Sequence, residues 1–288
     1  MNKLRRGLSL AGLALGLACS AASAVAQDEP PRKALKVCED PNNMPFSNAA
    51  GEGIEDRLAE LFGKALGLPV VYYRHPQRMN FVRNTIRFKL PDADYPCDIM
   101  LGVPVGFDQV SVTKPYYRST YALAYVQGRG LDGVKSVDDF LALPHERLAH
   151  LRIGVFDRSP ASAWLARHDL VDQGVPYKMM DADPSQYPGQ ILEKELAGGK
   201  LDAVIVWGPL AGWYAKRLDT AHLVVLPMAS EPGVKFDYQM AMGVRYGERE
   251  WKQQVEALID SRRDEIRAIL QSYGVPLLDL PPPTANAH

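Results

Sequence analysis

Hydrophobic and polar residues alternate along this chain in a series of short apolar runs separated by amphipathic stretches. In the stretch 53–67, GIEDRLAELFGKALG, apolar residues recur every three or four positions before a glycine, which predicts a helix. The stretch 78–90 has a similar spacing at Phe81, Ile86 and Leu90 and is also expected to be helical. The apolar runs around them are expected to be buried strands, at 34–37, 69–76 and 97–103. Strands that alternate with helices predict a parallel, doubly wound sheet.

A second series of the same kind follows. Its apolar runs are expected to be strands, at 151–157, 177–181 and 201–208. Its amphipathic stretches are expected to be helices, at 162–174 and at 185–199, the latter beginning near Pro188. Two α/β series in one chain predict a two-lobed α/β fold.

Two long extended runs, 119–130 and 237–247, connect the series, and an amphipathic helix pair follows at 249–274. They predict a two-stranded hinge, with crossings at Tyr121–Val126 and Met240–Val244. We expect lobe A over 33–120 plus 240–280 and lobe B over 121–239. A cleft is expected between the lobes, at the carboxyl ends of the strands, where open sheets bind ligands.

The first 26 residues have the layout of a secretory signal peptide. Three basic residues precede an apolar run that ends in small residues at Ala24 and Ala26, so we expect cleavage after Ala26 and export to the periplasm. No later stretch approaches the roughly 20 apolar residues of a membrane span. The proline-rich end, 281–288, is expected to be disordered.

The charge balance argues against one class of partner. The chain has 33 basic and 34 acidic residues, and losing the three basic residues of the signal peptide changes the formal net charge from −1 to −4. Because the chain has no basic stripe, nucleic acid is not expected as a partner.

Export leaves two of the three cysteines, Cys38 and Cys97. An oxidising compartment favours a disulfide between them. Two buried free thiols remain the alternative, because cysteines on neighbouring parallel strands could exceed the roughly 7 Å Cα separation that a disulfide allows.

The order of the expected elements resembles the type II periplasmic binding proteins of solute-binding protein family 3. Two motifs support this resemblance: VSVTKPYYRST at 110–120, similar to the strand end before the first crossing, and LDAVIVWGPLA at 201–211, similar to a strand of lobe B. The resemblance covers nearly the whole chain after the signal peptide, and it implies that the lobes close over a ligand by hinge motion.

A narrower resemblance rests on the segments LKVCEDPNNMPFSN, QRMNFVRNT, CDIMLGVPVGFD, TKPYYRSTY and VIVWGPLAGWYA. Together they resemble the MxaJ/XoxJ family, whose members are encoded beside PQQ-dependent methanol dehydrogenases. The intact DPNN-x-PFSN loop is closer to the XoxJ branch, which accompanies the lanthanide-dependent enzyme. The resemblance implies a periplasmic accessory protein of methanol oxidation that binds or activates the dehydrogenase.

Two ligand anchors of the amino-acid-binding members of the fold are replaced here. The position of the arginine that clamps the ligand's carboxylate is Gly106, and the position of the acid that receives its ammonium group is Trp207. Without these groups an amino acid would be buried with unpaired charges, at a cost of several kcal/mol. An importer receptor for a different, unidentified small molecule is therefore the alternative to the accessory role.

Several residues are candidates for contact with a ligand or partner. Trp207 is interpreted either as a core residue that fills a closed cleft or as an aromatic wall or partner contact. Of Tyr116 and Tyr117, one is expected in the core and the other in the cleft. Arg158 opens a helix of lobe B, where an anion could bind. The cleft or partner candidates are Asn42, Asn43, Phe46, Arg78, Tyr116, Tyr117, Arg158, Trp207 and Trp213, and Tyr214, Arg118 and Lys114 are further docking anchors.

Catalysis is not expected. The histidines have no metal-binding spacing, and nucleophile elbows and phosphate-binding loops are missing from the sequence. The carboxylate pairs Glu39–Asp40 and Asp98–Asp108 could act as acid and base, but Asp40 is better explained as the cap of the turn at Asn42. We expect no cofactor and no metal in this chain, since PQQ and the lanthanide belong to the partner enzyme.

Overall fold

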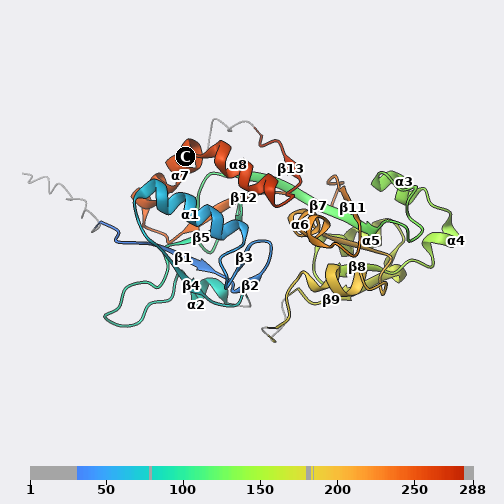
Figure 1. The fold of residues 1–288 in the computed structure, drawn as a ribbon, viewed down its shortest axis with the longest axis horizontal. Helices are drawn as coiled ribbons and strands as arrows, with labels where there is room; N and C mark the ends of the chain where they lie inside the picture. The colour runs from blue at the N-terminus through green and yellow to red at the C-terminus, as the bar shows by residue number, and fades with distance from the viewer. Residues whose placement is uncertain (1–30, 78–79, 180–182, 184, 282–288) are drawn as a thin grey trace, which may run out of the picture. The chain divides into compact units, whose positions relative to one another are not determined.

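The computed structural model describes residues 31–77, 80–179, 183 and 185–281 (Figure 1). The predicted signal peptide and all but the first residue of the predicted disordered tail lie outside the described residues. Within the described part of the chain, no helix combines the length and the apolar character that crossing a membrane requires.

The first α/β series forms a parallel sheet. β1 (Leu35–Glu39) lies between β4 (Val70–Arg74) and β5 (Ile99–Pro104), with Val37 opposite both Tyr72 and Ile99. The crossover from β1 to β4 contains α1 (Ile54–Leu66), which ends at Gly67 in the left-handed conformation that a glycine adopts without strain. We call the part of the chain built on this sheet the first lobe.

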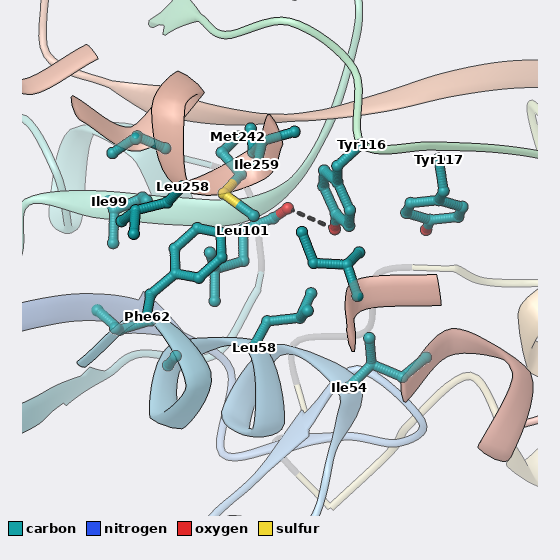
Figure 2. Packing of buried hydrophobic residues seen from close by; sticks show 14 of the residues in the cluster. Ile54, Leu58, Phe62, Ile99, Leu101, Tyr116, Tyr117, Met242, Leu258 and Ile259 are labelled. Carbon is teal, nitrogen blue, oxygen red and sulfur yellow. Dashed lines mark hydrogen bonds between the residues drawn. The ribbon is translucent and has the colours of Figure 1, made fainter. Parts of the chain in front are cut away.

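The core of the first lobe lies between this sheet and its helices. Ile54, Leu58 and Phe62 form the apolar stripe of α1 and contact residues of β5 (Figure 2). α7 (Arg249–Ser261) and α8 (Arg263–Ser272) pack in the same core as α1, and the Tyr116 hydroxyl donates to the Leu101 carbonyl at 2.7 Å. Each large apolar side chain buried here contributes roughly 1.5–3 kcal/mol to stability.

The second series forms another mostly parallel sheet, which defines the second lobe. β8 (Ile153–Phe156) pairs with β9 (Gly174–Tyr177) and β10 (Ala203–Trp207), and both pairings are parallel. Its core contains the fully buried Trp164, Phe140 and Phe236. α5 (Pro160–Arg167), α6 (Gly208–Arg217) and β11 (Leu223–Pro227) complete the main elements.

Two antiparallel strands connect the sheets. In β7 (Tyr117–Val126) the residues Tyr117–Thr120 pair with Asp237–Met240 of β12 (Asp237–Val244). β7 continues into the second sheet beside β10 and β11, and β12 continues into the first sheet beside β5. The two-stranded hinge therefore exists, but it lies a few residues before both predicted crossings, whose residues mostly belong to the sheets themselves. The exact lobe boundaries remain a prediction.

Shorter elements complete the chain. They are β2 (Asn42–Asn43), β3 (Ser47–Asn48), α2 (Phe81–Asn84), β6 (Ser111–Val112), α3 (Val137–Leu141), α4 (His145–Leu148), η1 (Val171–Gln173), η2 (Ile191–Leu196) and β13 (Leu277–Leu278). The last of these pairs with Ser119 and Arg118 of β7.

Two predicted helices are wrong in extent. The helix expected over 78–90 is reduced to the single turn of α2, because the backbone of Thr85 leaves the helical region, with φ of −123° and ψ of −99°. The Thr85 hydroxyl donates to the Phe81 carbonyl at 2.6 Å. The helix expected over 162–174 ends at Arg167, since Asp169 adopts a left-handed conformation, with φ of 56°. The strand expected over 177–181 forms earlier, as β9.

Candidate functional site

A cavity lies where the two lobes face each other, lined by residues of both. It has a volume of about 380 Å³, within the range of small-molecule sites. The first lobe contributes Cys38, Glu39, Asp40, Asn43, Phe46, Ser47, Glu55, Gln77, Phe81, Met100, Leu101, Gly102 and Pro104. The second lobe contributes Tyr121, Phe156, Met179, Pro188, Trp207 and Leu210, and β12 adds Tyr238 and Met240. No arginine, lysine or histidine is among these described lining residues.

The loop after β1, residues 40–48 with the sequence DPNNMPFSN, is called the signature loop. It holds the beginning of α1 against the cavity. The carbonyls of Pro45 and Phe46 accept hydrogen bonds from Ile54 and Glu55, each at 2.8 Å. This contact requires a glycine at Gly53, because a Cβ there would lie 2.1 Å from the Phe46 carbonyl oxygen. The loop thus fixes the backbone from which the Glu55 side chain projects.

Asp40 and Asp56 fix the loop by accepting backbone hydrogen bonds. Asp40 accepts from the Asn42 N–H at 2.7 Å and also from the Gln77 N–H. Asp56 closes a capping box with the Gly53 N–H at 2.8 Å. Both carboxylates therefore have structural roles, and the predicted turn cap at Asp40 is confirmed.

Glu55 lies at the cavity wall against β5. A Cβ on Gly102 would lie 2.4 Å from its Oε1, so the glycine provides the space that the carboxyl group occupies. Burial in the first place, followed by the charges of Asp56 and Asp40, raises the pKa of Glu55 to about 8. The raised pKa favours the neutral form of the Glu55 carboxyl group at neutral pH.

Glu39 lies at the end of β1 and is 1% exposed. Its Oε1 is 2.7 Å from Arg74 Nε, yet neither carboxyl oxygen accepts a hydrogen bond of good geometry. Burial, together with the neighbouring Asp56 carboxylate, raises the pKa of Glu39 to about 9, despite the opposing effect of Arg74. Two carboxyl groups with raised pKa thus line one cavity.

Three aromatic rings stand on the other side. Trp207, at the end of β10, is opposite Tyr121 of β7, and their ring centroids are 5.5 Å apart. Tyr238 of β12 lies 6.0 Å from Trp207 and 6.4 Å from Tyr121. The edge-to-face arrangement leaves ring surface available along the cavity.

Comparison with known proteins gives the family of the chain. No protein-family model matches it. The solved structure of the periplasmic binding protein XoxJ from Methylobacterium extorquens is 33% identical, covers 85% of this chain and 100% of that one, and superposes with a TM-score of 0.68. The chain belongs to the MxaJ/XoxJ family of periplasmic binding proteins.

Two more distant relatives agree with this assignment. Protein MoxJ of Paracoccus denitrificans is 26% identical over 85% of this chain and 89% of its own. The structure of MxaJ from Methylophaga aminisulfidivorans is 23% identical over 85% of this chain and 100% of that one, with a TM-score of 0.69, which supports the shared fold. The predicted family and two-lobed type II fold are confirmed, and membership implies a periplasmic protein associated with methanol oxidation.

The structure of this MxaJ/XoxJ-type protein brings some predicted residues to the cavity and leaves others away from it. Asn43, Phe46 and Trp207 line the cavity, whereas Asn42 pairs with Asn48 beside it. Arg158 is exposed and outside the lining, and Arg78 lies outside the described residues. Asp98 pairs with Arg32 and Arg245, at 3.0 and 2.9 Å, which supports a structural role.

The tyrosine prediction is wrong in part. Tyr116 and Tyr117 are both buried, at 8% and 4% exposure, and neither lines the cavity. Both pack in the core of the first lobe, where their ring centroids are 4.9 Å apart (Figure 2). Tyr117 and Tyr214 are also too buried to act as docking anchors, since Tyr214 is only 4% exposed.

Trp213 lies in a second hollow, of about 350 Å³, away from the main cavity lining. Its ring stacks on Tyr273 with centroids 4.8 Å apart, and the Arg217 guanidinium lies 4.6 Å from the ring centroid. The hollow is lined by Glu52, Arg57, Trp213, Lys216, Arg217, Ser272 and Tyr273.

Cys38 and Cys97 form a disulfide, with a Cα separation of 5.3 Å. It lies in a cluster with Met100, next to the cavity. The free-thiol alternative is therefore wrong in this structure, because Cys97 lies two residues before the start of β5 and reaches its partner on the adjacent β1.

Sequence reasoning missed Glu55, Ser47, Tyr121 and Tyr238. Glu55 could have been found from its place in the first turn of a helix that follows the signature loop by a few residues. Among the described residues, no group of three or more histidine, cysteine, aspartate and glutamate side chains could hold a metal ion.

Proposed function

We propose that this protein is an accessory factor of methanol oxidation that binds a PQQ-dependent methanol dehydrogenase in the periplasm. The observation that carries the proposal is the full-length match to XoxJ, which this chain covers completely. Identity is 33% to XoxJ and 23% to MxaJ, which favours the lanthanide-dependent dehydrogenase as the partner.

The cavity supports a role other than amino-acid uptake. Gly106 is at a turn with φ of +90° and does not line the cavity. The resemblance to amino-acid-binding members implies that Trp207 replaces the acid that would receive an ammonium group. With no basic side chain among the described lining residues, a ligand carboxylate would be buried without a counter-charge. An accessory protein does not need these anchors, nor does it need catalytic groups, and we propose that the chain is not an enzyme.

The second hollow offers a docking anchor. Trp213 presents an aromatic ring flanked by Arg217, and aromatic and arginine residues are enriched among the residues that dominate binding energy. A stable complex would bury roughly 800 Å² of this protein, so the hollow would form only part of the interface.

The proposal is tested by mixing the purified protein with lanthanide-loaded and calcium-loaded methanol dehydrogenases and measuring binding by biolayer interferometry. We expect saturable binding that is tighter for the lanthanide enzyme, and at least tenfold weaker binding by Trp213→Ala. Tyr246→Ala is the matched control, since Tyr246 is 65% exposed elsewhere on the surface. Absence of binding to both mature enzymes and to their metal-free, PQQ-free forms would contradict the proposal.

The cavity favours a second candidate function. A collapsed cleft filled by Trp207 would have excluded the import of a solute, whereas a cavity of about 380 Å³ is large enough for one. A receptor for a small molecule that is not an amino acid is therefore the second candidate, and a ligand that raises the melting temperature would support it.

A further inference from the structure

The carboxyl groups that line the cavity face no basic side chain among the described lining residues. Glu39, Asp40 and Glu55 line it from the first lobe, and no described lining residue is basic. Arg74 pairs with Glu39 from outside the lining and compensates only one carboxyl group. A bound positive charge would therefore gain interactions that a neutral or negative group would not.

A polar group at this wall also lacks a partner. Ser47 lines the cavity and is 1% exposed, and its hydroxyl has no hydrogen-bond partner. Because buried polar groups are normally paired, this hydroxyl indicates that a ligand or water completes the site.

The facing wall has the chemistry that complements a cation. The rings of Trp207, Tyr121 and Tyr238 lie within 6.4 Å of one another, and all three line the cavity. An aromatic face attracts an ammonium group, and tryptophan does so most strongly. Grouped rings of this kind recognise alkylated ammonium ions.

Glu55 from α1 and Trp207 from β10 line the same cavity. Both also act on the buried hydroxyl of Tyr117: burial first, and then the charge of Glu55, raises the pKa of this hydroxyl, while a hydrogen bond from Trp207 opposes the shift. A ligand in the cavity can therefore contact both the carboxyl group and the indole ring.

We propose that the cavity binds a small organic cation, an amine or quaternary ammonium ion, with its charge between Glu55 and the ring of Trp207. The cation carries an apolar body, for which Phe156, Leu210 and Met240 provide the remaining wall. This inference deepens the second candidate function and does not depend on docking to a dehydrogenase.

The experiment is isothermal titration calorimetry at pH 8.5 with choline, methylammonium and benzyltrimethylammonium. Two compounds of the shape of choline are the comparison: the neutral 3,3-dimethylbutan-1-ol and the anion 3,3-dimethylbutanoate. We expect at least one cation to bind with a dissociation constant below 1 mM, and choline to bind at least tenfold more tightly than its neutral analogue if choline is that cation. For a different cation, the neutral carbon analogue of that cation serves as the comparison.

Variants assign the binding to the two walls. Glu55→Gln keeps the shape of the side chain and is expected to weaken cation binding at least tenfold, whereas Glu60→Gln, on the exposed face of the same helix, leaves it unchanged. Trp207→Leu is expected to weaken cation binding more than Trp207→Phe does, with circular dichroism showing that each variant is folded.

Three results would overturn the inference: no cation binding up to 10 mM, equal binding of the neutral analogue, or equal affinities for Glu55→Gln and wild type. These outcomes are independent of the dehydrogenase measurement, so failure of the cation site and failure of the proposed accessory role can be distinguished.

Discussion

The first lobe gives the cavity all of its described carboxyl groups, whereas the second lobe gives it a wall of aromatic and aliphatic side chains. The acidic wall depends on a loop, a capping box and a glycine that bring Glu55 to its place. The aromatic wall follows directly from strand pairing, because Trp207 at the end of β10 is opposite Tyr121 in β7.

The difference between the walls is also one of energy. Rings packed at the second wall stabilise the fold through apolar contact. Buried acids at the first wall destabilise it, because each must remain protonated or be buried as a charge. The acidic wall lowers the stability of the fold, and a bound positive charge would therefore contribute most to binding energy there.

Among the substitutions compared at one pH, the largest effect is expected at the disulfide that supports the first wall. Replacing both Cys38 and Cys97 by alanine opens a loop with a sequence separation of 59 residues, which should lower the free energy of unfolding by about 4 kcal/mol. Guanidinium titration of the variant and of reduced wild type should give similar midpoints. A loss below about 1 kcal/mol would show that the acidic wall does not depend on this bond.

A smaller effect is expected at the loop contact. Gly53→Ala places a methyl group 2.1 Å from the Phe46 carbonyl oxygen and should lower the free energy of unfolding by about 1–3 kcal/mol. Gly133→Ala is the control, because a Cβ there meets no atom within 4 Å and should change stability by less than about 0.5 kcal/mol. Equal midpoints in urea for the two variants would contradict the tight contact between loop and helix.

The next effect is the pH dependence of stability. Glu55 and Glu39 have pKa values raised from 4.5 to about 8 and about 9. The contribution of their protonated carboxyl groups to the free energy of unfolding is therefore fully present below pH 4.5 and is lost as the pH rises through 8 to 9. The free energy of unfolding should fall by at most about 1.4 kcal/mol per pH unit for each proton.

Urea titrations at pH 5, 7 and 9 measure this slope. Glu55→Gln should flatten it and should be more stable than wild type at pH 9, whereas Glu60→Gln should keep the wild-type slope. A Glu55→Gln variant with an unchanged slope would show that Glu55 is ionised at all three pH values.

The sequence predicted the overall fold well because the apolar periodicity of α1 and the alternation of elements are local patterns. It placed Trp207 at the cavity through the resemblance and through the end of an apolar strand. It did not find Glu55, since the helical period assigns this residue to the polar face and says nothing of a second lobe opposite. The buried positions of Tyr116 and Tyr117 likewise depend on contacts with β5 and α1 that no local pattern contains.

The most direct test of the acidic wall is the release of protons when a cation binds. Titrating the tightest cation of the panel into the protein in two buffers of different ionisation enthalpy, at pH 6, 7.5 and 9, measures the number of protons released. The raised pKa values of Glu55 and Glu39 predict release near one proton at pH 6 to 7.5, falling toward zero above pH 9, with affinity rising over the same range. Binding that releases no proton and has the same affinity at all three pH values would contradict a carboxyl group as the partner of the cation.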